Sequence, residues 1–99
     1  MKTIIVCYTN NILDSSNIGT VKKYAFNTKN SVEVNDFLQS AAYTTNMQVV
    51  KVLDKSYKYF NQATGELSDE YTSTAQWFIK ELAIREDDSN VIYASKILV

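Results

Sequence analysis

Apolar and polar residues alternate along most of the chain, and this period of two predicts β-strands. The segment 2–9 is rich in Ile, Val and Thr and precedes a polar stretch, Asp14 to Gly19, which we interpret as a loop. In 21–28 aromatic residues alternate with small or polar ones, so one face of this strand is expected to be aromatic and buried. The alternation continues through 32–39 but breaks just after Asn35-Asp36, where we expect a kink or bulge.

The clearest alternation runs over 47–54. Met47, Val49, Lys51 and Leu53 share one parity, and Gln48, Val50, Val52 and Asp54 share the other. Because both parities carry Val, the pattern predicts an interior strand covered at least in part on both faces, as in a small curled sheet or barrel. A short strand is expected at 57–60, and Gly65 is the expected positive-φ residue in the turn of a hairpin that follows.

The segment 72–86 fits either a helix or a strand. Its apolar residues at 75, 78, 79 and 82 make a helical stripe, and the same region also alternates as a strand would. The run Asp87-Asp88-Ser89-Asn90 is a compact polar link to the β-like segment 91–99. We therefore favour strands in 77–86 and 91–99 that close as a β-hairpin, and a short helix near 68–82 is the alternative.

These patterns predict one mostly β domain over residues 1–99: a mostly antiparallel curled sheet, barrel or sandwich with at most one short helix. The chain has 99 residues, 45% of them apolar, which is enough for a single core. Pro is absent and few charges are expected to point inward, so the outer strands are poorly protected against pairing with other chains. We therefore expect a homodimer or a higher homo-oligomer.

Four segments together resemble a layout found in small phage-encoded β-domain proteins. They are the aromatic strand 23–28, the turn Val32-Glu33-Val34-Asn35-Asp36, the hydrophobic strand 47–52 and the segment 77–82. The layout usually has Gly where this chain has Asn35, and Asn is the residue that best replaces Gly in a left-handed conformation. Proteins of this kind include the Thoeris anti-defence sponges, so the resemblance, over about residues 21–84, implies a phage protein that sequesters a cyclic nucleotide-type immune signal without cleaving it.

The residue types needed for catalysis are scarce. The chain has no His, and its one cysteine, Cys7, lies within an apolar strand where a thiol is usually inert. No spacing singles out a pair of carboxylates, and no Gly-rich phosphate loop is present. The acidic run at 86–88 lacks the ligand spacing of a calcium loop. We therefore expect a protein that is not an enzyme and that uses no cofactor or metal.

Charge and hydropathy limit which partners and which compartment are expected. The formal net charge is -1, which disfavours generic nucleic-acid binding, although residues 1–60 hold seven Lys against four acids. No apolar run is long enough to cross a membrane and none resembles a secretory signal. A lone cysteine is typical of a reducing compartment, so we expect the cytoplasm. The resemblance to phage-encoded proteins implies that this is the cytoplasm of an infected bacterial host.

Aromatic and cationic residues supply the candidate binding site. Tyr57 and Tyr59 are expected on one strand face, with Lys58 and Phe60 on the other and Asn61 next along the chain. Their rings suit base stacking or a partner's pocket, and packing in the core or across strands is the alternative. Arg85 is the only guanidinium in the chain, and Lys51 and Lys58 are possible companions in an anion site. The leading hypothesis is a binding protein for a small nucleotide ligand; the alternative is an inhibitor that docks on a host protein through an aromatic strand face or an exposed sheet edge.

Overall fold

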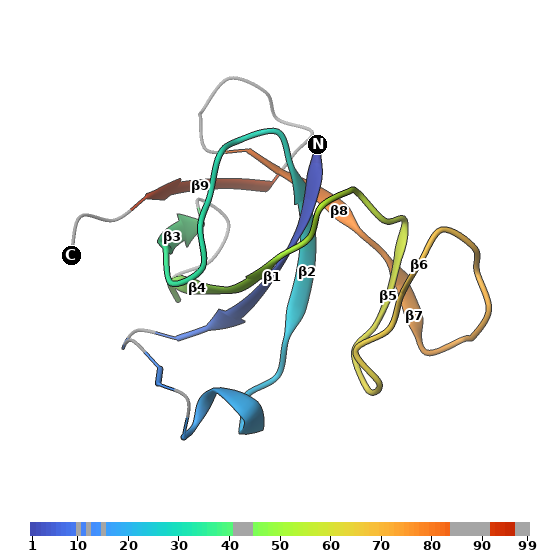
Figure 1. The fold of residues 1–99 in the computed structure, drawn as a ribbon, viewed down its shortest axis with the longest axis horizontal. Helices are drawn as coiled ribbons and strands as arrows, with labels where there is room; N and C mark the ends of the chain where they lie inside the picture. The colour runs from blue at the N-terminus through green and yellow to red at the C-terminus, as the bar shows by residue number, and fades with distance from the viewer. Residues whose placement is uncertain (10, 12, 15, 41–44, 84–91, 97–99) are drawn as a thin grey trace.

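The computed structural model describes residues 1–9, 11, 13–14, 16–40, 45–83 and 92–96, and strands are its main regular structure (Figure 1). The strands are β1 (Lys2–Tyr8), β2 (Tyr24–Thr28), β3 (Phe37–Ser40), β4 (Met47–Val52), β5 (Tyr59–Asn61), β6 (Leu67–Ser68), β7 (Gln76–Phe78), β8 (Lys80–Ala83) and β9 (Ile92–Lys96), and a short 3-10 helix spans Ile18–Thr20. Within these ranges no helix is long and apolar enough to cross a membrane. The prediction of a mostly β fold is confirmed.

Six strands form a curled sheet that closes into a barrel in the order β1-β2-β8-β9-β3-β4. Both neighbours of β1 and both neighbours of β3 are antiparallel to them. By contrast, β8 runs parallel to β2 and to β9. The predicted closing hairpin between 77–86 and 91–99 is therefore wrong, because the strands of a hairpin are antiparallel. In the barrel β8 lies between β2 and β9 and is parallel to both, and the local pattern of residues does not indicate this direction.

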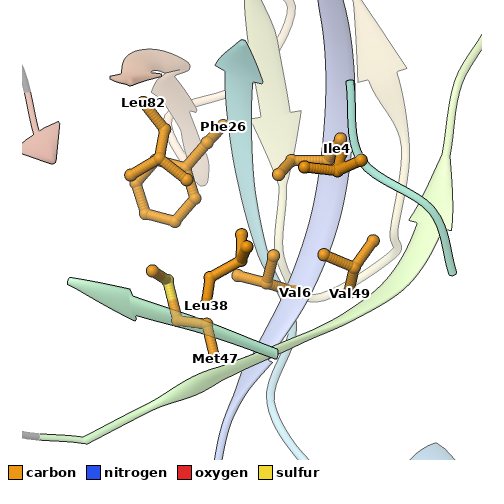
Figure 2. Packing of buried hydrophobic residues seen from close by; sticks show 8 residues of the cluster. Ile4, Val6, Phe26, Leu38, Met47, Val49 and Leu82 are labelled. Atoms are coloured by element: carbon orange, nitrogen blue, oxygen red, sulfur yellow. The ribbon is translucent and has the colours of Figure 1, made fainter. Parts of the chain in front are cut away.

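The interior of the barrel holds one hydrophobic cluster (Figure 2). Its buried members come from β1, β2, β3, β4, β8 and the loop after β2: Ile4, Val6, Phe26, Val32, Leu38, Met47, Val49 and Leu82. Alternate residues of β1 point to opposite sides of the sheet, so Ile4 and Val6 face the interior of the barrel, whereas Ile5 faces outward and packs in a second hydrophobic cluster. The continuous apolar run in β1 thus reflects a strand that is covered on both faces.

Strand β4 is an interior strand, as expected, but its parity changes along its length. Val49 pairs with Val6 and Lys51 pairs with Ile5, so Val50 is an extra residue on β4. Beyond this bulge the inward position passes to Val52, which packs against the interior cluster. Lys51 is exposed and does not share the buried environment of Val49, and the predicted strict alternation over 47–54 is therefore wrong.

A second, three-stranded antiparallel sheet in the order β6-β5-β7 covers the outer wall of the barrel. Phe60 and Ile79 from this region pack against Ile5 and Ala25 of the barrel in a second hydrophobic cluster. The ambiguous segment 72–86 contains a turn at 74–75 and then two strands as far as the structure describes it: β7 belongs to the small sheet, and β8, one residue later, belongs to the barrel. The preference for strands over a helix near 68–82 is confirmed.

Two turns take the conformations expected from their residues. Asn35 has a φ of 74°, in the left-handed region that Asn tolerates better than other non-Gly residues. Its backbone N–H donates to Val49 O at 2.7 Å, which attaches the turn to β4. Gly65 has a φ of 77° in the turn that joins β5 to β6. Both turn conformations are as expected, but the strand predicted over 32–39 begins only at Phe37, because a turn at Val34 and Asn35 replaces its first half.

The buried side chain of Gln48 fastens two loops to the barrel. Gln48 Oε1 accepts from Leu13 N at 2.7 Å, and Gln48 Nε2 donates to Leu13 O at 3.1 Å and to Asn35 Oδ1 at 3.2 Å. The side chain is 0% exposed. One amide therefore holds both the loop after β1 and the turn before β3 against the wall.

Candidate ligand pocket

A pocket of about 740 Å³ lies between the outer wall of the barrel and two loops. One loop is the segment 21–23 that follows the 3-10 helix, together with Gly19 of that helix, and the other is the turn after β5, at 62–65. The wall contributes Ile5 from β1 together with Val50 and Lys51 from β4. Figure 1 shows the 3-10 helix and the turn after β5 toward the same end of the molecule. Segments far apart in the sequence thus build this site.

Three lysines line this pocket, which we call the lysine pocket: Lys22, Lys23 and Lys51. No carboxylate is found among its described lining residues. Lys22 and Lys51 are exposed, whereas Lys23 is half-buried and its Nζ donates to Val21 O at 2.6 Å. Three like charges around one concavity raise the local positive potential and favour an anionic ligand.

The floor of the lysine pocket is apolar. It is formed by Ile5, Val50 and Phe60, and Phe60 is only 2% exposed. These residues belong to, or pack against, the second hydrophobic cluster, so the floor is held by the contact between the two sheets. An apolar floor excludes water from one side of the site and strengthens the interaction between an ammonium group and a bound anion.

Hydrogen bonds fix the turn that forms one rim. Asn61 Oδ1 accepts from Ala63 N at 3.0 Å and from Thr64 N at 3.3 Å, and Gly65 N donates to Asn61 O at 2.7 Å. Gln62 Nε2 donates across the pocket rim to Lys23 O at 2.8 Å. The two loops are therefore connected directly, and Asn61 shapes the rim without lining the pocket itself.

The structure does not bring the sequence-predicted site residues together in one place. Lys51 lines the lysine pocket, but Tyr57, Lys58, Tyr59 and Asn61 do not. Tyr57 packs against the second hydrophobic cluster, and the Nζ of Lys55 lies 4.5 Å from the centre of its ring. Lys58 is an exposed residue at the start of β5.

Arg85 lies outside the described residues, as does the acidic run at 86–88. Sequence reasoning missed Lys22, Lys23 and Gln62. The pair Lys22-Lys23 next to Gly19 was the available signal for the first two. Nothing in the sequence singles out Gln62.

Tyr59 belongs to a second feature, an aromatic patch on the outward face of the small sheet. Its ring centre lies 5.6 Å from that of Tyr71 and 6.0 Å from that of Phe78, both in edge-to-face geometry. Tyr71 is 57% exposed and Phe78 is 62% exposed. Rings that contact one another while remaining this exposed offer an apolar surface to another molecule.

A smaller cleft of about 210 Å³ opens near the N-terminal end of β1. It is lined by Lys2 and Lys29 and by the interior residues Ile4, Val32 and Val52. Its volume falls below the range of about 300–1,000 Å³ that is usual for organic ligands. The cleft supplies a lysine, Lys29, that serves below as a control for the larger pocket.

The described part of the chain has one buried thiol, that of Cys7 in β1. Cys7 is 0% exposed, and burial raises the pKa of its thiol, an effect that the nearby charge of Lys23 offsets only in part. The raised pKa keeps the thiol protonated and unreactive at neutral pH. Over the described ranges, no three His, Cys, Asp or Glu side chains gather closely enough to hold a metal ion.

In comparisons with known proteins, no protein-family model, curated protein or solved structure matches the chain.

Proposed function

We propose that this protein is a non-enzymatic binding protein that holds a small phosphorylated ligand of the nucleotide type in the lysine pocket. The observation that carries the proposal is the combination of three lysines, no carboxylate and an apolar floor around about 740 Å³ of space. Ammonium groups bind phosphate oxygens through charge-assisted hydrogen bonds, and the apolar floor suits the organic part of the ligand.

The volume supports a nucleotide-sized ligand. Pockets for organic ligands typically measure about 300–1,000 Å³, and the lysine pocket falls in this range whereas the cleft beside Lys2 does not. Preformed sites lose less entropy when they bind, and the rims of this pocket are fixed by the hydrogen bonds of Asn61 and Gln62.

Sequestration is the biological activity that we propose for this site. A protein that only retains a signal needs affinity and a fixed pocket, without a nucleophile or an acid-base pair. The resemblance to anti-defence sponges points to a cyclic nucleotide-type immune signal as the ligand and to an infected bacterial cell as the setting. Removing free signal would then neutralise the host's defence.

Thermal unfolding with a panel of cyclic nucleotides tests this function. A ligand at 100 times its Kd stabilises the folded state by about 2.7 kcal/mol, which corresponds to a rise in Tm of roughly 10 °C or more for a domain of this size. The double variant Lys22→Gln/Lys51→Gln removes two exposed ammonium groups and should weaken binding about 10-fold or more. Lys29→Gln, in the smaller cleft, is the matched control and should bind as the wild type does.

A steric variant provides a test that does not depend on charge. A Cβ added at Gly19 would meet no atom within 4 Å, so Gly19→Val should fold normally while its side chain occupies space at the pocket. Weaker binding in this variant and in the double lysine variant supports the assignment. If none of the cyclic nucleotides raises the Tm, or if the lysine variants bind as well as Lys29→Gln, the proposal fails.

The aromatic patch favours a second candidate function, inhibition of a host protein by docking. Aromatic side chains are enriched in the energetically dominant centres of protein interfaces, and Tyr71 and Phe78 are well exposed. If this function holds, the double variant Tyr71→Ser/Phe78→Ser abolishes co-purification of one specific host protein while Gly19→Val leaves it unchanged. The opposite pattern excludes docking through this patch.

A further inference from the structure

The side-chain amide of Gln62 has a defined orientation at the rim of the lysine pocket. Its Nε2 donates to the backbone carbonyl of Lys23 at 2.8 Å. A carbonyl oxygen can only accept a hydrogen bond, so the amide nitrogen must point toward Lys23 and the flipped alternative is excluded. The carbonyl oxygen Oε1 of Gln62 accepts no hydrogen bond from the residues that the structure describes.

This oxygen differs in chemistry from the lysines around it. Lys22, Lys23 and Lys51 present only donors. Thr64, the hydroxyl residue at the same rim, already accepts from Glu66 N at 3.3 Å. Gln62 therefore adds an uncommitted acceptor to a pocket whose charged side chains all donate.

A fully ionised phosphate can satisfy the lysines but has no proton to offer a carbonyl oxygen. The acceptor is therefore matched only when the organic part of the ligand carries an N–H or O–H group. We propose that Gln62 is the specificity-determining residue of the lysine pocket and that its Oε1 accepts a hydrogen bond from a base N–H or a sugar hydroxyl of a phosphorylated ligand.

This inference rests on the proposed function and narrows it. The lysines supply affinity for any compact polyanion, whereas Gln62 separates nucleotides and sugar phosphates from inorganic anions. The bond to Lys23 holds the amide in place before the ligand arrives, so little conformational entropy is lost when Oε1 accepts a donor.

Calorimetric titration with three kinds of probe tests the proposal. Cyclic AMP and cyclic GMP carry charge, sugar and base; ribose 5-phosphate carries charge and sugar hydroxyls; pyrophosphate carries charge alone. Gln62→Met keeps the length of the side chain but removes both the acceptor Oε1 and the donor Nε2 that bonds Lys23 O. Pyrophosphate, which needs the lysines but not the acceptor, therefore reports any effect of losing this contact between the loops. For the wild type we expect both pyrophosphate and at least one cyclic nucleotide to bind. Because the two carry different charges, the effect of a variant is measured for each probe as the ratio of its affinity to that of the wild type.

In Gln62→Met, the affinity for that nucleotide should fall by about 3- to 10-fold, which is the usual effect of losing one neutral hydrogen bond. Binding of pyrophosphate should change by less than about 2-fold, because the lysines remain. Thr64→Val, which alters another side chain of the same rim, is the matched control and should preserve the preference for the nucleotide. If ribose 5-phosphate also loses affinity in Gln62→Met, the donor is a sugar hydroxyl; if it does not, the donor belongs to the base.

The outcomes separate this inference from the function on which it depends. If Gln62→Met lowers the affinity for nucleotide and pyrophosphate equally, or for neither, Gln62 does not determine specificity, although the lysine pocket still binds anions. If no probe binds the wild-type protein, the proposed function fails and the inference with it. A circular dichroism spectrum that matches the wild type confirms that Gln62→Met is folded, and Gln62→Ala repeats the test if that variant is not.

Discussion

Replacing Gln48 with Met should test how much one buried amide contributes to this fold. Gln48 makes three hydrogen bonds, two to the backbone of Leu13 and one to Asn35, and its side chain is fully buried. Met has a similar length and is readily buried, so Gln48→Met removes the hydrogen bonds without leaving a large cavity.

The magnitude follows from the contacts. Each hydrogen bond contributes about 1 kcal/mol net, so the loss of the set costs about 3 kcal/mol. The Met side chain is more apolar than that of Gln, so its burial offsets about 1 kcal/mol of this loss of stability. We therefore expect the free energy of unfolding to fall by about 2 kcal/mol, a large share of the 5–15 kcal/mol that is typical for a domain.

Urea unfolding followed by the fluorescence of Trp77, the single tryptophan, measures this change. With a urea dependence of about 1.5 kcal/mol per M, the midpoint should fall by roughly 1.3 M. Hydrogen exchange should also accelerate at the amide of Leu13, which loses its acceptor.

Gln76→Met is the matched control for this experiment. Gln76 is also buried, and its Oε1 accepts from Thr72 N at 2.6 Å and Ser73 N at 3.1 Å in a different loop. That variant should lower stability while leaving exchange at Leu13 unchanged. A midpoint for Gln48→Met within about 0.2 M of the wild type would refute the reasoning, since it would mean that the bonds of Gln48 contribute almost nothing.

Three further predictions concern the turn at Asn35, the two faces of the small sheet and the thiol. Asn35→Val should lower the free energy of unfolding by about 1–3 kcal/mol because a β-branched residue is strained at a φ of 74°, and Asn35→Gly should cost less in the same urea titration. Phe60→Ala should cost about 3–5 kcal/mol, whereas Phe78→Ala should stay within about 0.5 kcal/mol, because Phe60 is 2% exposed and Phe78 is 62% exposed. Because burial raises the pKa of Cys7, its thiol should react with a disulfide reagent at pH 8 only after unfolding in urea, and rapid labelling of the native protein would contradict its placement in the wall.

The sequence carried enough information to predict the strands and the special turns. Alternation of apolar residues depends on which side of a sheet is covered, and this information is local, so β1, β2 and β4 were recognisable. Asn35 and Gly65 were recognisable because few residue types adopt a positive φ. These features require no knowledge of distant contacts.

Features that depend on distant contacts were not predictable in this way. The parallel pairing of β8 follows from barrel closure, and the bulge at Val50 moves Lys51 out of the parity that its neighbours suggest. The lysine pocket combines residues from 5, 19–23, 50–51 and 60–65, which no spacing along the chain brings together. Lys51 was identified as a possible companion of Arg85 in an anion site, but the lysines that share its pocket became evident only in the fold.

The passage from β7 to β8 constrains how this molecule can be divided. Only Ile79 separates the two strands; it is 2% exposed and its N–H donates to Lys58 O at 2.8 Å. The small sheet therefore has no flexible tether and cannot be excised as an independent module. A shortened chain without it would bare the apolar wall around Ile5 and Ala25 and lose one rim of the lysine pocket, so solubility and ligand retention should disappear together.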